Sequence, residues 1–362
     1  MSYMQEYEKW LASPALNEQE HAELESIRDD EKEIRERFYG PLEFGTAGLR
    51  GTMKVGLHQM NIHVIRWATQ GFANVICAEG EEAKRRGVAL CMDCRNHSME
   101  FARAAAEVCA ANGIHVRIFE SLRPTPELSF AVREYDCQAG INVTASHNPK
   151  EYNGYKVYWS DGAQLPPQHA AAIARELEQI DIFTGVRRME FDDAKAQGLI
   201  EIMGAETDER FMSHVMAMVN DRESMAKVAD TFHMVYTPFH GCGWKLVPEA
   251  LRGLGVKHLH CVPEQMVLDG SFPTVVSPNP ENPEGFYLAI QLADKVGADF
   301  ILGTDPDSDR VGIMVRTKDD DFVVISGNQT GVLLLDYLIG AKRRTGKMPE
   351  NPVALKTIVT TE

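Results

Sequence analysis

The segment FILGTDPDSDRVGI carries three aspartates at alternate positions, directly after an apolar run: Asp305, Asp307 and Asp309, the aspartate triplet. Alternation in an extended segment places the three carboxylates on one side of the chain, where they repel one another unless a cation lies among them. Oxygen ligands favour a hard ion such as Mg²⁺ or Ca²⁺ over zinc. An EF-hand is excluded because Arg310 and Arg316 occupy its glycine and glutamate positions. The triplet predicts a metal site, with a solvated acidic turn as the alternative, and Arg310 adds a guanidinium that suits a phosphate.

A second segment, NVTASHNPKEYNGYKVY, joins an apolar strand to a turn of small residues that holds Ser146. Ligands of open α/β sheets gather beyond the carboxyl ends of the strands, so a reactive hydroxyl at this place would meet a substrate. The G-x-S-x-G elbow of hydrolases is missing, which counts against an acyl-enzyme. Asn-Pro and Asn-Gly turns would return Lys156 toward the serine. A serine in an ordinary polar turn, with a surface lysine nearby, is the alternative.

A third segment, FGTAGLRG, is rich in glycine and carries a single arginine, Arg50, near its end. Its glycines permit close approach of the backbone to an anion, and Arg50 could close over that anion. The segment matches neither the Walker A nor the G-x-G-x-x-G pattern. A serine hydroxyl, a hard-metal triplet and arginines together favour phosphoryl transfer, in which a protein mainly positions groups and neutralises charge.

Alternating strands and helices are expected to position these segments. The apolar run VALCM predicts a strand, and helices and strands alternate from there to the serine segment. Such alternation is typical of a parallel sheet with right-handed crossovers. Strands are expected at 88–92, 114–119 and 139–145, and helices at 98–112 and 124–135. Upstream, residues 17–38 are densely charged and begin with a capping box of Asn17 and Glu20. Apolar residues recur there at helical spacing, which predicts a solvated helical extension that packs against the body of the protein: Leu24, Ile27, Ile34 and Phe38.

The alternation begins again in the second half of the chain. Strands are expected at 232–236, 258–262 and 299–303, and helices at 244–254 and 285–296, which makes a second α/β unit. A third unit would begin with FVVIS, a helix at about 328–343 and an apolar segment at 353–359. One helix and one strand cannot bury both faces of a sheet, so this third unit is expected to be incomplete.

Length and composition are those of an ordinary globular chain. The 362 residues allow two or three domains of ~150 residues, and 37 basic against 53 acidic residues give a net charge of −16. So acidic a chain lacks the footprint of a general nucleic-acid binder. It has neither an apolar run of the ~20 residues that a membrane span needs nor a secretory leader in MSYMQEYEKW. Seven cysteines, an odd number, favour reduced thiols, so we expect a cytoplasmic protein that binds neither nucleic acid nor membrane.

Taken together, the motifs resemble those of the α-D-phosphohexomutase superfamily, the phosphoglucomutases and phosphomannomutases. TASHNP with Lys156 ten residues after Ser146, GTDPDSDR and FGTAGLRG carry the resemblance, which covers nearly the whole chain from about Glu43 onward. The charged N-terminal segment, YTPFHG and SPNPENPEG are most similar to the longer phosphoglucomutase and phosphopentomutase branch. The resemblance implies an α/β fold of tandem repeated α/β domains, with mixed, mainly parallel sheets sandwiched by helices.

The domain limits expected from this resemblance divide the chain into three parts. Residues 1–203 would hold the helical extension and domain I with the phosphoserine loop. Residues 204–320 would form domain II with the metal-binding loop, and residues 321–362 would begin domain III.

The resemblance also implies roles for the matching residues. Ser146 would be the phosphoserine that donates and recovers the phosphoryl group, and one oxygen of its phosphate would complete the Mg²⁺ shell formed by the aspartate triplet. Arg50 and His147 would line the phosphoserine site. Lys156 would handle the proton of the sugar hydroxyl, and Arg310 would bind phosphate or orient the sugar.

The implied activity is that of a Mg²⁺-dependent isomerase of carbohydrate metabolism, a phosphoglucomutase. Phosphate would move from Ser146 to the 6-hydroxyl of glucose 1-phosphate, and glucose 1,6-bisphosphate, the intermediate and activator, would return its 1-phosphate to the serine. Asp93 and Arg95, after the VALCM strand, would support this site. Small-molecule sugar phosphates are the expected partners, and the sequence predicts no oligomeric state.

Three alternatives stay open. Phosphopentomutase and phosphomannomutase belong to the same superfamily and would use the same loops on another sugar phosphate. An aspartate-nucleophile phosphatase would use Asp305, although Asp309 stands where its D-x-D-x-T motif needs threonine. The third alternative is a remnant that binds metal or sugar phosphate without turnover, and it is motivated by loops of the superfamily that are missing from the C-terminal part of the sequence.

The C-terminal part is where the sequence departs from the superfamily. Members have four domains, with a sugar-recognition loop in the third and a phosphate-binding loop in the fourth, and neither loop occurs in these residues. The last segment, NPVALKTIVTTE, is expected to be the opening strand of the third domain. A truncated chain is therefore expected.

Overall fold

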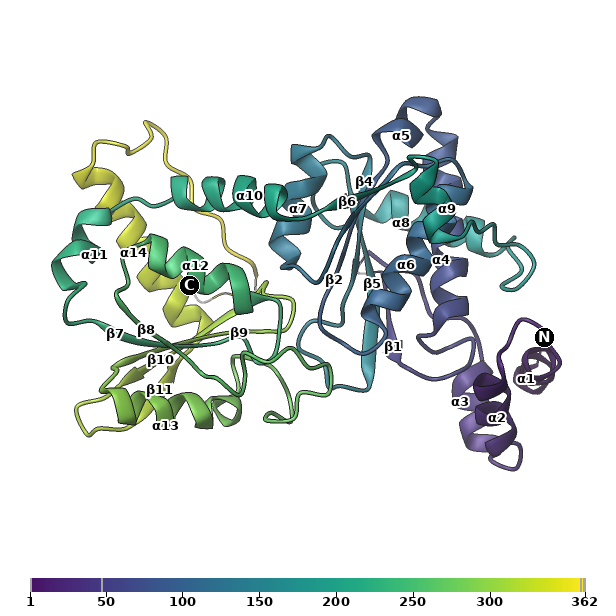
Figure 1. Ribbon diagram of the computed structural model, residues 1–362, viewed down its shortest axis with the longest axis horizontal. Helices are drawn as coiled ribbons and strands as arrows, with labels where there is room; N and C mark the ends of the chain where they lie inside the picture. The colour runs from purple at the N-terminus through teal and green to yellow at the C-terminus, as the bar shows by residue number, and fades with distance from the viewer. Residues whose placement is uncertain (1, 47, 359, 361–362) are drawn as a thin grey trace. The chain divides into compact units, whose positions relative to one another are not determined.

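The computed structural model describes residues 2–46, 48–358 and 360 (Figure 1). They form two compact units, Met1–Thr207 and Asp208–Glu362, here called the N-terminal unit and the C-terminal unit. Helix α10 (Ala205–Ala217) crosses the division between them.

The N-terminal unit contains a six-stranded mixed sheet in the order β1-β5-β4-β2-β3-β6. Strands β4, β2, β3 and β6 are parallel, whereas β5 is antiparallel to both β4 and β1. The three strands predicted from the alternation are present and parallel, while β1, β5 and β6 were not predicted. The bounds are β1 (Leu49–Thr52), β2 (Val88–Met92), β3 (Val116–Phe119), β4 (Ala139–Val143), β5 (Tyr152–Trp159) and β6 (Ile200–Met203).

Helices cover both faces of this sheet, and the side chains of its central strand β2 therefore point alternately into two separate cores. Val88 and Leu90 belong to the core that includes α4 and α6, whereas Ala89 and Cys91 pack with the buried side chains of α7. A parallel strand that is buried on both faces reads as a continuous apolar run, and VALCM is such a run. The helices are α4 (Ile62–Ala78), α5 (Glu81–Arg86), α6 (Ser98–Ala111), α7 (Thr125–Glu134), α8 (Pro167–Leu177) and α9 (Phe191–Ala196).

The N-terminal extension consists of three helices, α1 (Tyr3–Leu11), α2 (Glu18–Ser26) and α3 (Glu31–Phe38). The capping box of Asn17 and Glu20 is confirmed at the start of α2. The extension is helical as predicted, and Leu24, Ile34 and Phe38, which were expected to recur on a helix, are buried in the same core as α4. The dense charges of this segment lie on the outer faces of helices whose apolar positions dock on the domain.

The C-terminal unit contains a five-stranded sheet in the order β11-β10-β9-β7-β8. Strands β9, β7 and β8 are parallel, and β10 is antiparallel to both β9 and β11. The strands predicted for this second α/β unit are confirmed, and β10 was not predicted. The bounds are β7 (His233–Thr237), β8 (His258–Cys261), β9 (Phe300–Thr304), β10 (Val311–Arg316) and β11 (Phe322–Ile325), with helices α11 (Arg222–Val228), α12 (Gly243–Gly253), α13 (Tyr287–Val296) and α14 (Gly327–Arg344) and a 3₁₀ turn at Pro283–Phe286.

The segment FVVIS, which was expected to begin a third α/β unit, forms a strand of the sheet in the C-terminal unit. Strand β11 pairs with β10 in register from Ile313 opposite Ile325 to Arg316 opposite Phe322, so residue 320 is not a boundary between sheets. Helix α14 follows as predicted, and the described residues after it contain no strand.

Within the described ranges, no helix combines the length and the apolarity that crossing a bilayer requires. All seven cysteines are free thiols, and burial raises the pKa of the Cys91 thiol at the centre of the sheet.

Candidate active site

Ser146 lies just beyond the carboxyl end of β4, in a turn that holds its backbone in an unusual conformation. Its φ is 53°, in the left-handed region, and the residue is only 2% exposed. The Ser146 N–H donates to Thr144 Oγ1 at 2.8 Å, and Ser146 Oγ lies 3.2 Å from His147 Nδ1. Residues 144–152, here called the serine loop, therefore present a fixed hydroxyl next to an imidazole.

The neighbouring strand β2 ends in groups that bind the serine loop. Asp93 Oδ2 accepts a hydrogen bond from Thr144 Oγ1 at 2.7 Å, and Asp93 Oδ1 accepts one from Ser98 Oγ at 2.8 Å. Arg95 Nη2 donates to the carbonyl oxygen of Ser146 at 2.6 Å. Because β2 and β4 are parallel neighbours, their carboxyl ends meet, and the expected support of the site by Asp93 and Arg95 has a geometric basis.

The Gly-rich segment brings Arg50 to the serine loop. Leu49–Thr52 forms β1, which pairs with β5, and the Arg50 Nη1 donates to Asn148 Oδ1 at 3.2 Å. Arg50 is exposed, so its guanidinium is accessible from solvent. The sequence singled out Asn148 only as the start of an Asn-Pro turn, and its amide oxygen also accepts this hydrogen bond from Arg50.

Lys156 lies on β5, the strand that leaves the serine loop. It is the register partner of Asn142 on β4, and it is only 4% exposed. Paired residues of adjacent strands share a face of the sheet, so the buried side chain of Lys156 lies on the same face as that of Asn142, near the carboxyl end of β4. That turns of the serine loop return Lys156 toward Ser146 stays a prediction, supported by the pairing of β5 with β4.

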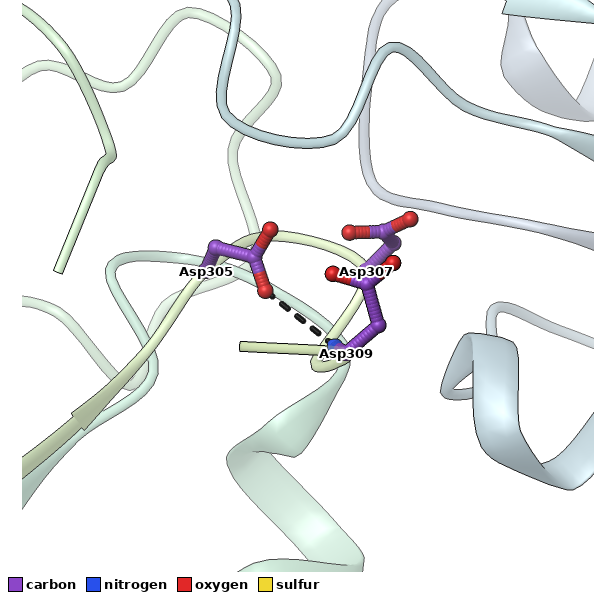
Figure 2. Close-up of side chains that lie close together, drawn as sticks. All are labelled: Asp305, Asp307 and Asp309. Carbon is purple, nitrogen blue, oxygen red and sulfur yellow. Dashed lines mark hydrogen bonds between the residues drawn. The ribbon is translucent and has the colours of Figure 1, made fainter. Parts of the chain in front are cut away.

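The aspartate triplet follows β9 in the C-terminal unit, and Figure 2 shows its carboxylates gathered around one loop. One oxygen from each of Asp305, Asp307 and Asp309 lies within 4.8 Å of the others. Asp305 and Asp307 are buried at 0% and 1% exposure, and Asp309 is exposed. Asp305 Oδ1 accepts the backbone N–H groups of Asp309 at 3.2 Å and of Arg310 at 3.1 Å, which curls the loop around that carboxylate.

This arrangement fits a hard divalent cation. Ionised carboxylates are rarely buried unless they are paired or coordinate a metal, and two of these three are buried within a few ångströms of each other. The donors are all oxygens, the ligand type that Mg²⁺ and Ca²⁺ prefer. Arg310 Nε lies 3.9 Å from Asp309 Oδ1 at the exposed side of the loop, where a phosphate could reach it.

Sequence reasoning named YTPFHG only for its resemblance and missed that this segment packs against the loop of the aspartate triplet. The Cys242 N–H donates to the carbonyl oxygen of Pro306 at 2.8 Å, and a β-carbon built on Gly241 would overlap the backbone of Pro306. The glycines of YTPFHGCG were the signal, because glycine permits such close approach of two backbones. In the other unit, the hydroxyl of Thr144 gave no such signal, since threonine is common near strand ends.

Comparisons with known proteins agree with this geometry. Residues 41–182 match the family model of the phosphoglucomutase/phosphomannomutase α/β/α domain I. Residues 209–318 match the family model of α/β/α domain II of the same proteins. A phosphoglucomutase of Staphylococcus saprophyticus is 35% identical over 335 residues, which cover 92% of this chain and 58% of that protein. A phosphoglucomutase of Staphylococcus aureus strain MRSA252 is 36% identical over 313 residues, 85% of this chain and 54% of that protein. The chain thus spans somewhat more than half the length of the curated relatives it matches.

Solved structures show the same fold. A phosphoglucomutase/phosphomannomutase family protein from Burkholderia thailandensis superposes with a TM-score of 0.63 at 19% identity, over 82% of this chain and 59% of that one. The open form of parafusin, a phosphoglucomutase from Paramecium, gives a TM-score of 0.57 at 18% identity, over 76% of this chain and 54% of that one. Both domain matches, the relatives and the fold lead to one conclusion. The chain belongs to the phosphoglucomutase and phosphomannomutase family of the α-D-phosphohexomutase superfamily.

Proposed function

We propose that this chain carries out the phosphoryl transfer of a phosphoglucomutase, interconverting glucose 1-phosphate and glucose 6-phosphate through a phosphoserine at Ser146. The observation that carries the proposal is the position of Ser146 at the carboxyl end of β4, with its backbone held by Thr144 and Arg95. Relatives about 35% identical over most of the chain are phosphoglucomutases, which supports glucose phosphates as the substrates.

The proposed step exchanges one phosphorus–oxygen bond for another. The 6-hydroxyl oxygen of glucose 1-phosphate bonds to phosphorus as the bond from phosphorus to Ser146 Oγ breaks, and the hydroxyl proton passes to a base, for which Lys156 is the candidate. Glucose 1,6-bisphosphate then returns its 1-phosphate to Ser146 by the reverse exchange, which leaves glucose 6-phosphate. Arg50 and His147, which lie at the serine loop, would bind the oxygens of the transferring group.

Magnesium is the cofactor that we propose for this reaction. Asp305, Asp307 and Asp309 would hold the ion, and when bound it offsets negative charge on the transferring phosphoryl group. Arg310 would bind phosphate or orient the sugar at the exposed side of the same loop. The buried pair Asp305 and Asp307 supports this assignment because their charges need compensation.

We further propose a cytoplasmic setting and sugar phosphates as the partners. Seven free cysteines support a reducing compartment, the cytoplasm. The net charge of −16 supports small anionic sugar phosphates, met at a few arginines, over nucleic acid as the partner. Mannose phosphates and pentose phosphates are the alternative substrates, which a phosphomannomutase or a phosphopentomutase of the same superfamily would use.

Intact-mass measurement after incubation with glucose 1,6-bisphosphate and Mg²⁺ tests the proposal. We expect one added phosphate per chain, lost in Ser146→Ala and kept in Ser160→Ala, a control serine in the turn after β5. A phosphate that persists in Ser146→Ala would refute the phosphoserine, and one located on Asp305 would favour the phosphatase alternative.

A coupled assay with glucose 1-phosphate, mannose 1-phosphate and ribose 1-phosphate then separates the substrates. Turnover fastest with glucose 1-phosphate supports the proposed function. Phosphorylation of Ser146 without turnover of any of the three would favour the alternative in which this chain binds and accepts phosphate only.

A further inference from the structure

Arg95 makes an unusual set of hydrogen bonds, because its guanidinium donates to four backbone carbonyl oxygens of one loop. All four belong to the serine loop, and the side chain of Arg95 is fully buried. Nη2 donates to Ser146 and Asn148, both at 2.6 Å, and Nη1 donates to Pro149 at 2.9 Å and Tyr152 at 3.0 Å. One side chain therefore gathers the carbonyls of a seven-residue stretch around a single point.

The anchor of this guanidinium is rigid. Arg95 Nε lies 3.2 Å from Asp93 Oδ2, and both side chains have no exposed surface. The backbone N–H of Arg95 donates to Asp93 Oδ1 at 3.0 Å, directly after β2 at the centre of the sheet. Buried ion pairs contribute little net stability compared with apolar packing, but they can specify one arrangement over others. The pair is thus better suited to fixing geometry than to holding the fold together.

The geometry that it fixes is that of Ser146. The left-handed conformation at φ 53° is unfavourable for a residue with a β-carbon and persists only where the surroundings enforce it. Thr144 Oγ1 accepts the N–H of the peptide group before Ser146, and Arg95 binds the carbonyl of the peptide group after it. With both flanking peptide planes held, the backbone dihedrals of Ser146 and the direction of its Cα–Cβ bond are set.

We propose that Arg95 is a positioning residue for phosphoryl transfer, which clamps the serine loop so that Ser146 Oγ keeps its place whether or not it carries phosphate. This inference rests on the proposed function of Ser146. The clamp needs arginine, because a planar fork with five N–H donors can serve several carbonyls in different directions. A lysine at this position keeps the charge next to Asp93 but presents its three donors from one atom.

The test compares Arg95→Lys with a matched control, Arg86→Lys. Arg86 also donates to backbone carbonyls, of Asp136 at 2.9 Å and Cys137 at 3.3 Å, but at the opposite end of β4. Two quantities are measured in each variant: the rate of Ser146 phosphorylation by glucose 1,6-bisphosphate, and hydrogen exchange of the amides in residues 144–152.

We expect Arg95→Lys to slow phosphorylation by about tenfold to a hundredfold, the effect of an ångström-scale misplacement of a reacting group. Its serine-loop amides should exchange faster, while exchange elsewhere in the N-terminal unit is unchanged. Arg86→Lys should alter neither quantity. A folded Arg95→Lys protein that is phosphorylated at the normal rate would overturn the proposal, as would equal slowing in both variants.

A second variant, Arg95→Ala, distinguishes the loss of the guanidinium group from a general loss of structure. In Arg95→Ala, added guanidinium ion should restore part of the phosphorylation rate, whereas an equal concentration of methylammonium should not. Rescue by both ions, or by neither, would contradict a clamp that depends on the fork. If the unmodified chain takes up no phosphate, the proposed function fails, and the hydrogen-exchange comparison still decides whether Arg95 holds the loop.

Discussion

Gly48 lies directly against the backbone carbonyl oxygen of Tyr155, so closely that a β-carbon built on this glycine would overlap that oxygen. The glycine has a φ of 75°, a conformation that other residues rarely adopt. The next residue, Leu49, is the register partner of Tyr155 at the start of β1. The contact therefore seats β1, and with it Arg50, on the strand that carries Lys156.

Replacing Gly48 with alanine should detach β1 from β5. Both the positive φ and the overlap oppose a β-carbon, so we expect a loss of about 1–3 kcal/mol in the free energy of unfolding. Urea denaturation of the N-terminal unit measures it. Gly45→Ala is the control, because a β-carbon there meets no atom within 4 Å. Equal losses of unfolding free energy in Gly48→Ala and Gly45→Ala would show that the contact of Gly48 with Tyr155 is not what makes alanine unfavourable.

The end of β4 illustrates what could be predicted from the sequence. The apolar runs VALCM and AGINVTA could be recognised as buried parallel strands, and the rule that ligands gather at carboxyl ends then selected Ser146. Pairing of β5 with β1 was not predicted, because antiparallel pairing with a distant segment leaves no periodic signal within either strand. The resemblance named Arg95 as a supporting residue, but its four hydrogen bonds to the serine loop could not be predicted, since the acceptors are backbone carbonyls, which every residue type possesses.

The aspartate triplet shows a different limit. Its alternation predicted that the three carboxylates gather, and they do. The supporting contact of Gly241 with Pro306 joins residues 65 positions apart and depends on backbone proximity alone, which single-sequence patterns do not carry. The N-terminal extension was predicted as one helical segment over residues 17–38, whereas the structure divides these residues between α2 and α3 and places α1 before them.

Hydrogen bonding by the Thr144 hydroxyl leads to a second prediction. This fully buried group donates to Asp93 and accepts the N–H of Ser146, so Thr144→Val removes both bonds at nearly constant shape. Leaving such buried groups unsatisfied costs about 1–3 kcal/mol. Thr144→Ser keeps the hydroxyl and loses one methyl group, worth about 1 kcal/mol. We expect the valine variant to be the less stable of the two in urea and the slower in phosphorylation of Ser146; a valine variant as stable as the serine one would contradict this role.

Magnesium should stabilise the C-terminal unit through the aspartate triplet. Ligand at a hundred times its dissociation constant adds about 2.7 kcal/mol to the free energy of unfolding, which calorimetry detects as a raised melting temperature. Asp305→Asn should lose most of this gain. Its amide oxygen can still accept the N–H groups of Asp309 and Arg310, so the loop should keep its shape.

The metal-free proteins provide the sharper comparison. Without a cation the three carboxylates repel one another, so in a chelator Asp305→Asn should melt no lower than the unmodified chain, and higher if the repulsion is strong. Asp319→Asn, in the exposed turn before β11, is the control and should keep the full response to magnesium. A magnesium response that survives in Asp305→Asn would place the stabilising ion elsewhere.

Three stacked imidazoles on β7 and β8 predict a dependence of stability on pH. His233 and His258 are register partners whose ring centroids lie 4.3 Å apart, and the ring of His260 lies 5.7 Å from that of His233. Nδ1 of His233 and Nε2 of His260 are buried and find no hydrogen-bond partner among the described residues. His258 Nε2 lies 3.2 Å from the carbonyl oxygen of Asp230, whose carboxylate pairs with Lys257.

Burial lowers the pKa of His260 below its ordinary 6.5, and the adjacent His233 and His258 lower this pKa further. The unfolded chain therefore takes up the proton first as the pH falls, so this part of the stability is present above about pH 6.5 and is lost below it. His260→Gln should flatten the fall of unfolding free energy between about pH 6.5 and 5, measured by urea titration at each pH. His21→Gln, in α2 of the other unit, should leave the slope for the C-terminal unit unchanged. If His260→Gln leaves the slope as steep as in the unmodified chain, the stacked imidazoles are not what couples this sheet to pH.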